Sequence, residues 1–343
     1  MIDAEAIRKL GYEPRFVAKA QSVHRPAPVN LAPEDQGLFS HENLYQAPDA
    51  YWFELENARV LGRDILARPL NLFRHFTRVQ GQPMRLKEIV RTHFWWNIRS
   101  PKVVPQAIWA TDNWSFGYFH WILDVLPRLQ LLGPWASEIP LLVPSRFKDL
   151  RFVSETLDLF GQAYMFHDPR EPVLVNRLFV TSHTSLTGNY NPEILQQVRN
   201  RLFTSAKSSS QGRRIFISRS RAAKRTIVNE GDLIPLLESH GFEIVHMEEY
   251  GFRDQISLMQ SASIIAGLHG AGLSNALFMN SPGAMLEIRN GDDAMNNCFF
   301  NLAAACGHRY AYVKGIGNTE VTNVANVTVN KTELDSAIRS LVI

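Results

Sequence analysis

A histidine, an aspartate and an arginine recur at helical spacing inside an apolar stretch of the chain. His120, Asp124 and Arg128 lie in the segment FHWILDVLPR, at residues 119–128. On a helix these positions share one face, and burying such a polar stripe is costly unless its members are paired or face a cleft. A histidine beside a carboxylate can serve as a general base. The stripe could equally be a structural His–Asp–Arg network, and the residues alone leave both interpretations open.

A glycine-rich segment, GLHGAGLSN, occupies residues 267–275 after an apolar stretch and before a helical pattern. Gly270 and Gly272 allow the backbone to come close to a ligand, and Ala271 lies between them. The N–H groups at the start of the following helix offer an anion site, to which the His269 side chain can add a donor. The spacing is not that of the dinucleotide fingerprint, and a tight turn without a ligand is the alternative.

An acidic residue, Glu287, follows this segment by about 20 residues, at the predicted end of the next strand. A carboxylate at that distance binds ribose hydroxyls in dinucleotide-binding folds. We therefore predict that Glu287 contacts the ribose of a nucleotide.

Six of the thirteen residues from Arg213 to Arg225 are Lys or Arg. Arg219 comes just after a predicted strand, and ligands of open parallel sheets bind beyond the carboxyl ends of the strands. Because guanidinium groups bind phosphate oxygens in pairs, Arg219, Lys224 and Arg225 are candidates for a phosphate site. A solvated basic loop is the alternative. The other basic residues are predicted to lie on the surface: Arg213, Arg214 and Arg221.

Other chemistries are poorly supported. The GLSNA segment at residues 272–276 approaches the nucleophile elbow of hydrolases, but Ser274 is predicted to lie inside the helix and not at the turn. Cys298, Cys306 and His308 lack the paired spacing of metal sites, so both cysteines are predicted to be core residues. The sequence has no D-x-D, H-E-x-x-H or Walker motif. We predict neither a metal ion nor another cofactor.

Composition limits the class of protein. The chain has 343 residues, of which 45% are hydrophobic and 20% charged, with a net charge of +3; these values indicate folded domains. The small net charge argues against a nucleic-acid partner. The longest apolar runs are far shorter than the roughly 20 residues of a membrane span, and residues 1–10 lack an apolar signal core. We predict a cytoplasmic protein, attached at most peripherally to a membrane, and make no prediction of its oligomeric state.

The second half of the chain alternates between strand and helix patterns. Strands are predicted at residues 214–218, 242–246, 263–266, 284–288 and 310–313. Helices are predicted at residues 229–240, 253–260, 273–279 and 295–306, and a last one after Asn330, with Glu333 forming a capping box. Alternation at this spacing predicts a parallel sheet covered on both faces.

The first half is less regular. Residues 1–50 are rich in proline and predict an extended arm over the first domain. Asn191 followed by Pro192 predicts the start of a helix. Other strands are predicted at residues 58–61, 106–110, 140–143 and 178–181, and helices at residues 119–132 and 147–160.

A polar segment, TSAKSSSQG at residues 204–212, is the predicted hinge. It divides the chain into an N-terminal lobe, residues 1–205, and a C-terminal lobe, residues 206–343, which the resemblance described next makes the acceptor side and the nucleotide-sugar-binding side. Each lobe is predicted to be Rossmann-like.

Three parts of the chain, taken together, resemble glycosyltransferase family 61. They are FGYFHWILDVLPRLQLL at residues 116–132, RRIFISRSRAAKRTIVNE at residues 213–230, and IIAGLHGAGLSNALFM with GAMLEI at residues 264–279 and 283–288. That family includes bacterial capsule and polysaccharide enzymes, plant xylosyl- and arabinosyltransferases and animal N-acetylglucosaminyltransferases. The resemblance covers roughly residues 106–290.

The resemblance implies an α/β protein with a GT-B-like fold, in which two Rossmann-like lobes face a central cleft. It also implies an inverting mechanism without an essential metal ion and a nucleotide-sugar donor held mainly by the C-terminal lobe. Residues that match the family's motifs are the basic pair Arg219 and Arg225, the turn residues His269, Gly270 and Gly272, the acidic Glu287, and His120 with Asp124 in the N-terminal lobe. Gly117 stands where the family motif often has an asparagine.

These features predict a glycosyltransferase that moves a sugar from a UDP-linked donor to a glycan, a glycolipid or another hydroxyl acceptor, in surface polysaccharide biosynthesis. The cations and N–H groups would stabilise the leaving diphosphate, and Asp124 or His120 would deprotonate the acceptor. The alternative is a non-catalytic protein of the same fold that binds a nucleotide or a sugar phosphate. A dinucleotide oxidoreductase is disfavoured because the fingerprint is missing.

Overall fold

The computed structural model describes residues 4–62, 64–67, 71–78, 99–203, 212–222, 224–291 and 293–342. The chain forms two compact units, one made of Met1–Gln21 with Ala47–Thr187 and the other of Ser22–Gln46 with Gly188–Ile343. Residues 22–46 and 188–205 therefore belong to the second unit, whereas the sequence analysis placed them in the first lobe. The predicted hinge at residues 204–212 lies outside the described residues, except for Gly212.

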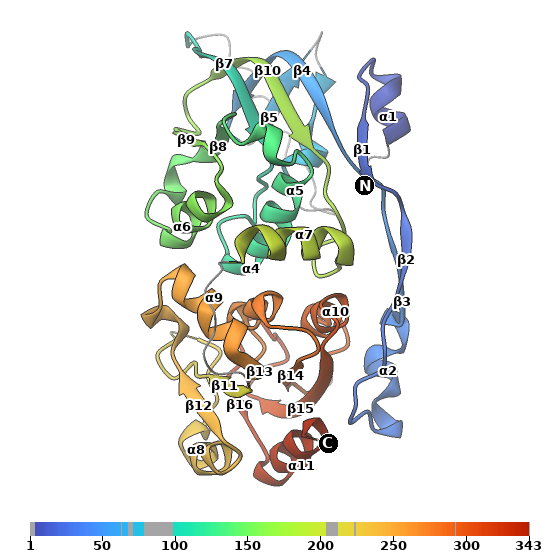
Figure 1. Cartoon of the computed structure of the whole chain (residues 1–343), viewed down its shortest axis with the longest axis vertical. Helices are drawn as coiled ribbons and strands as arrows, with labels where there is room; N and C mark the ends of the chain where they lie inside the picture. Colours follow the sequence, from blue (N-terminus) through green and yellow to red (C-terminus); the bar gives the residue numbers. More distant parts are fainter. Residues whose placement is uncertain are drawn as a thin grey trace. The chain divides into compact units, whose positions relative to one another are not determined.

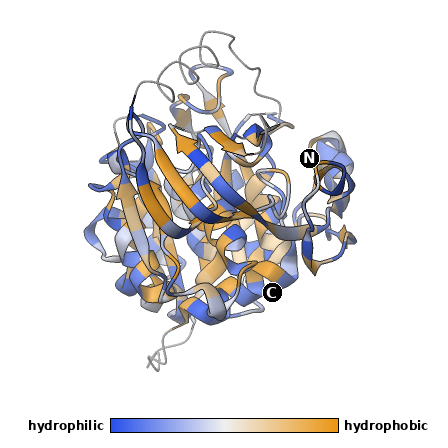
Figure 2. Ribbon diagram, turned by 90° about the horizontal axis from the view of Figure 1, so that it is seen from above, coloured by the Kyte–Doolittle hydropathy of each residue, from blue (hydrophilic) through white to orange (hydrophobic). Residues whose placement is uncertain are grey.

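The first unit contains an eight-stranded mixed sheet. Its strands are β1 (Arg15–Ala18), β4 (Ala50–Leu61), β5 (Asp64–Ala67), β6 (Asn71–Leu72), β7 (Lys102–Trp109), β8 (Leu141–Pro144), β9 (Tyr164–His167) and β10 (Val173–Thr181). The order is β6-β5-β4-β10-β7-β8-β9, with β1 also paired to β4. β10, β7, β8 and β9 are parallel, whereas β4 runs antiparallel to β10, β1 and β5. The strands of this unit carry the long hydrophobic stretches visible in Figure 2.

The helices of the first unit are α1 (Ala4–Lys9), α4 (Tyr118–His120), α5 (Leu126–Gln130) and α6 (Arg151–Phe160). The single helix predicted at residues 119–132 is interrupted by a π-helical stretch, Trp121–Val125, between α4 and α5. Pro127 explains this interruption, because it has no N–H for the α-helical bond to the Leu123 carbonyl. Single-turn 3-10 helices lie at Arg74–Phe76, Pro134–Ala136 and Ser145–Phe147.

The second unit contains a six-stranded sheet in the order β12-β11-β13-β14-β15-β16 (Figure 1). The strands are β11 (Arg213–Ile217), β12 (Phe242–Val245), β13 (Ala262–Leu268), β14 (Ala284–Asn290), β15 (Arg309–Gly317) and β16 (Val327–Thr328). All are parallel except β16, which runs antiparallel to β15. The parallel sheet predicted for this half of the chain is thus confirmed.

The helices of the second unit are α7 (Pro192–Leu202), α8 (Glu230–Ser239), α9 (Phe252–Ser261), α10 (Cys298–Ala305) and α11 (Lys331–Leu341). α8 and α11 pack on one face of the sheet, and Figure 1 shows α9 and α10 on the other. The helix predicted at residues 273–279 is instead a 3-10 helix, Ala271–Phe278. Both predicted N-caps are confirmed: Asn191 accepts from the Glu193 and Ile194 amides, and Asn330 accepts from those of Thr332 and Glu333.

The arm predicted to extend over the first domain is more structured than expected. Its second part, Ser22–Gln46, holds β2 (Gln21–His24), α2 (Gln36–Phe39), β3 (Leu44–Ala47) and 3-10 turns at Pro33–Asp35 and Ser40–Glu42. It packs on the second unit, where the Asn30 amide donates to the Tyr312 carbonyl at 2.8 Å and Asp35 pairs with Lys314 at 2.7 Å. No helix in the described part of the chain is long and apolar enough to cross a bilayer.

Candidate functional site

Two of the predicted motifs meet at the carboxyl edge of the second sheet. β11 and β13 are parallel neighbours with Ile217 opposite Gly267, so the residues that follow these strands leave the sheet side by side. The Arg219 guanidinium lies against Gly270, where a Cβ atom would be 2.9 Å from Nη1 and 3.4 Å from Cζ. A side chain at position 270 would therefore force the guanidinium to shift, and the structure brings the basic loop and the glycine turn together.

The loop that follows β11 curls around the Arg219 side chain. Nε donates to the Arg225 carbonyl at 2.8 Å and Nη2 to the Lys224 carbonyl at 3.2 Å, so the guanidinium presents Nη1 to the glycine turn. Burial lowers the pKa of Arg219, and the charge of Arg225 lowers it further. The charge of Glu248 opposes these two effects as the smallest of the three. Two arginines that interact in this way can bind an anionic ligand.

Arg225 has a strained backbone, with φ at 58° in the left-handed region that non-glycine residues rarely adopt. Its Nε atom is buried and has no hydrogen-bond partner in the structure. Strain of this kind concentrates at binding sites. Lys224 is exposed. The other arginines of the cluster are engaged elsewhere: Arg213 with Glu243, Arg214 with the His240 carbonyl and Arg221 with Glu249.

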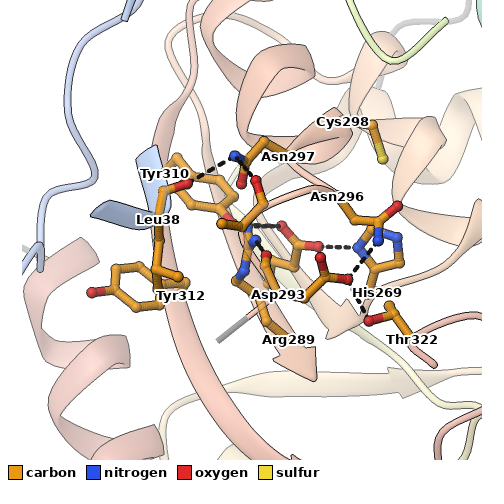
Figure 3. Close-up of polar contacts among 12 residues, drawn as sticks. Leu38, His269, Arg289, Asp293, Asn296, Asn297, Cys298, Tyr310, Tyr312 and Thr322 are labelled. Atoms are coloured by element: carbon orange, nitrogen blue, oxygen red, sulfur yellow. Dashed lines mark hydrogen bonds and ion pairs between the residues drawn. The ribbon is translucent and has the colours of Figure 1, made fainter. Parts of the chain in front are cut away.

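Behind the glycine turn, His269 is hydrogen-bonded to Glu287 (Figure 3). Gly267 lies opposite Glu287 in the sheet, and alternation along β13 points Gly267 and His269 to the same side. His269 Nδ1 therefore meets Oε1 of Glu287. The hydroxyl of Tyr310 donates to the other oxygen, Oε2, and Arg289 lies 3.8 Å from it.

The position of Glu287 differs from the prediction. The residue lies inside β14, which continues to Asn290, and its side chain is fully buried. Both carboxylate oxygens already accept hydrogen bonds. Each carboxylate oxygen can accept a further hydrogen bond, but the Glu287 side chain is 0% exposed. A ribose could therefore reach it only if the surrounding residues moved.

The carboxylate of Glu287 is held in its charged form. Burial alone would raise the pKa of Glu287, but the charge and hydrogen bond of His269, the charge of Arg289 and the Tyr310 hydroxyl outweigh burial and lower it. Burial and the charge of Glu287 raise the pKa of Tyr310 well above its usual value. Tyr310 therefore keeps the proton that it donates.

In the first unit, His120 and Asp124 come together as predicted. His120 Nδ1 lies 2.8 Å from Asp124 Oδ2, which also accepts from the Thr187 hydroxyl at 3.3 Å. No hydrogen bond joins Arg128 to this pair, although the charge of Asp124 acts on its guanidinium. Its Nη2 donates instead to the Phe76 and Thr181 carbonyls at 2.7 and 2.9 Å, so the predicted three-residue stripe is not a continuous hydrogen-bonded network.

The geometry of this pair assigns different roles to its members. Burial raises the pKa of Asp124, although the hydrogen bond from His120 opposes that effect. The Asp124 side chain is 9% exposed and that of His120 is 21% exposed. With Nδ1 turned to the carboxylate, Nε2 is the ring nitrogen left to accept a proton. The arrangement is that of a histidine base oriented by an aspartate.

The comparison with protein-family models covers both motifs of this site. Residues 118–286, slightly less than half of the chain, match the family model of Glycosyltransferase 61. This match and the relatives described next support a glycosyltransferase of that family. The matched residues include His120, Asp124, Arg219, Arg225 and His269, and they end one residue before Glu287.

The curated relatives are proteins named EGF domain-specific O-linked N-acetylglucosamine transferase. The Drosophila melanogaster protein is 31% identical over 116 residues, which are 33% of this chain and 22% of the relative. The Rattus norvegicus protein is 31% identical over 121 residues, which are 34% of this chain and 23% of the relative. The Xenopus laevis protein is 33% identical over 91 residues, which are 25% of this chain and 17% of the relative. The aligned part thus spans less than a quarter of these relatives.

Within the residues that match the family model, the other two glycines of the turn also lie where a Cβ atom would come close to a neighbour. A Cβ at Gly272 would lie 3.1 Å from Cγ2 of Ile217, and one at Gly267 would lie 3.2 Å from the Ile217 carbonyl. Ala271 begins the 3-10 helix, whose first N–H groups have no partner inside the helix. Ser274 is buried within that helix, as predicted.

The two cysteines near the family 61 motifs are free thiols. Burial raises the pKa of both, that of Cys306 to about 12. His308 accepts from the Gly283 amide at 3.1 Å and donates to the Ala276 carbonyl at 3.0 Å, so backbone contacts occupy both ring nitrogens. Within the described ranges, no three His, Cys, Asp or Glu side chains are grouped to hold a metal ion.

Sequence reasoning missed Arg289 and Tyr310, which complete the surroundings of Glu287. The segment AMLEIRN of β14 contained a usable signal, because Glu287 and Arg289 are two residues apart in a strand buried throughout. Residues at that spacing share a face, and buried charges must be paired. A charged pair in such a strand therefore predicts a buried polar network.

Proposed function

We propose that the chain is a GT-B glycosyltransferase that transfers a sugar, with inversion and without an essential metal ion, from a UDP-linked donor to a glycan or glycolipid hydroxyl. We propose further that it acts in the cytoplasm, in surface polysaccharide biosynthesis. The observation that carries the donor site is the contact of the Arg219 guanidinium with Gly270, at the carboxyl edge of a parallel sheet and within the residues that match the family model.

The donor diphosphate would lie against the Arg219 and Arg225 side chains and the N–H groups that begin the 3-10 helix Ala271–Phe278. Cations and backbone dipoles fixed in advance stabilise the negative charge that develops on the leaving UDP. The relatives are named N-acetylglucosamine transferases, so UDP-N-acetylglucosamine is the first donor to test.

The acceptor side of the reaction would rest on His120. Its Nε2 would take the proton of the acceptor hydroxyl while that oxygen bonds to the anomeric carbon and the bond to the UDP oxygen breaks. Asp124, bound to Nδ1 at 2.8 Å, would orient the ring and stabilise the imidazolium that forms. Attack from the face opposite the leaving group inverts the anomeric centre.

A donor screen tests this function. Nucleotide-sugars with UDP, GDP, CMP and dTDP groups would be compared by thermal shift and by slow hydrolysis of the sugar without acceptor. Stabilisation together with hydrolysis supports a transferase, whereas stabilisation by free nucleotides without any turnover supports a non-catalytic binding protein. If no nucleotide binds, the donor site is wrong.

UDP is expected to stabilise the protein equally in magnesium and in excess EDTA, because side-chain cations and N–H groups supply the charge compensation. The measurement is the shift in Tm at a fixed UDP concentration in each buffer. A stabilisation that disappeared in EDTA would contradict a metal-independent site.

Replacing Gly270 by Ala is expected to weaken UDP binding by roughly three- to tenfold, a part of the 1.5–3 kcal/mol of a charged hydrogen bond. The new Cβ would lie 2.9 Å from Arg219 Nη1, so the guanidinium must move. Calorimetric titration with UDP measures the effect. Gly231→Ala is the control, because a Cβ there meets no atom within 4 Å; equal effects at both positions would rule out the steric explanation.

A further inference from the structure

We propose that Glu287 acts through His269, by fixing the imidazole and favouring its protonated form when a diphosphate is bound, so that donor binding takes up a proton. Nε2–H of His269 would then be a cationic hydrogen-bond donor to the phosphates. This inference rests on the proposed function, and it gives Glu287 a positioning role in place of the ribose contact expected from the sequence.

The first step is the orientation of the ring. His269 Nδ1 bonds to Glu287 Oε1, and the Phe299 ring packs edge-on against the imidazole with centroids 5.0 Å apart. The Glu287 side chain is 0% exposed and that of His269 is 10% exposed. Of the two residues, only His269 reaches the surface, so any effect of the carboxylate on a ligand must pass through the imidazole.

The second step is the charge behind the ring (Figure 3). Arg289 lies 3.8 Å from Glu287 Oε2, and the charges of both Glu287 and Asp293 act on its guanidinium. Glu287 therefore shares this cation with Asp293. The other oxygen of Glu287 is in direct contact with His269 Nδ1, where a carboxylate favours a protonated imidazole.

The third step is the charge on the side of His269 that faces away from Glu287. Arg219 lies against Gly270, next to His269, and Arg225 interacts electrostatically with Cys298 on α10. Both side chains are cations. A bound diphosphate compensates them and adds negative charge beside Nε2, which raises the affinity of the ring for a proton.

Binding of the diphosphate and binding of the proton favour each other. Because a bound anion beside Nε2 favours the protonated imidazole, binding takes up a proton to the extent that the ring is neutral before the anion binds. UDP affinity should therefore decrease as the pH rises from 7 to 9. The terminal phosphate of UDP does not contribute, since its second pKa is about 6 and it is already ionised over this range.

Calorimetric titration with UDP at pH 8 in two buffers of different ionisation enthalpy gives the number of protons taken up. The wild type is expected to take up a measurable fraction of one proton. Glu287→Gln retains an oxygen that can accept from Nδ1–H but has no charge. It should lose the uptake, flatten the pH dependence and bind UDP about tenfold more weakly at pH 7, the factor that corresponds to one unit of pKa.

Asp335→Asn is the matched control, because His240 Nε2 and Asp335 form a second His–carboxylate pair in the same unit, 2.6 Å apart, between α8 and α11. Its proton uptake should equal that of the wild type. Tyr310→Phe removes one hydrogen bond to Glu287 but no charge, so uptake should persist. If Glu287→Gln fails to fold, His269→Gln provides the same test, since it must also abolish the uptake.

Two results would overturn the inference while leaving the proposed function intact. One is UDP binding by the wild type with no proton uptake. The other is a Glu287→Gln protein that binds UDP more weakly but retains the uptake and the pH slope, as expected if Glu287 is structural or contacts the ribose. A wild type that binds no UDP would remove the proposed donor site, and this inference with it.

Discussion

Replacing Asp124 by Asn is expected to lower turnover about 100-fold or more, the usual scale of general-base catalysis. Asparagine keeps the shape of the side chain but removes the charge that orients His120 and stabilises its protonated form. UDP affinity and Tm should hardly change, because the donor is proposed to bind to the second unit. Steady-state turnover with a UDP-sugar and acceptor, together with Tm, measures both effects on one protein.

The structural alternative predicts a different pattern for the same variant. If the His120–Asp124 pair only stabilises the fold, a half-satisfied buried network should cost roughly 1–3 kcal/mol of stability. Asp149→Asn, at an exposed position of the same unit, is the control and should change neither quantity. A stable Asp124→Asn protein with normal turnover would refute both the catalytic and the structural role.

Replacing Arg219 by Ala is expected to weaken UDP binding by about 1.5–3 kcal/mol, the range of a hydrogen bond to a charged group. This corresponds to more than a tenfold loss in affinity. Arg225→Ala should have an effect of the same order, because its guanidinium lies in the same loop. Calorimetric titration with UDP measures each variant.

Arg214→Ala is the control for the basic cluster. Its guanidinium donates to the His240 carbonyl at 2.6 Å, at the C-terminus of α8 and so at the opposite edge of the sheet from Arg219. The loss of UDP affinity should be much smaller. If all three variants weakened binding alike, the cluster would be a diffuse basic patch and not a phosphate clamp.

The second sheet could be predicted because its sequence follows local rules. Buried parallel strands such as ASIIAGL in β13 are short apolar runs, and helices separate them at regular intervals. The start of α7 was predictable from Asn191 and Pro192, since capping depends on residues that are neighbours in sequence. Arg219 and the glycine turn were both predicted to follow strands of a parallel sheet, but the pairing of β11 with β13, which brings them together, was not predicted.

The parts that could not be predicted depend on contacts between distant residues. The antiparallel half of the first sheet is organised by β4 pairing with β10, with Leu55 opposite Leu178, and nothing local specifies that register. The Glu287 network was missed for the same reason, because Tyr310 reaches Glu287 from another strand. The π-helical stretch shows that a helical period can indicate a helix without fixing the face on which Arg128 lies.

Each of the two units is made of two segments that alternate along the sequence, and this has a consequence for the order of folding. Asn30 and Tyr312, which bond to each other, are 282 residues apart, so Ser22–Gln46 leaves the ribosome long before its partner strand β15 exists. Contacts of such high sequence separation slow folding, and the early segment must wait while the intervening chain is synthesised. The unit that holds the candidate donor site can therefore be completed only at the end of translation. A fragment of residues 188–343 would lack the segment that covers β15.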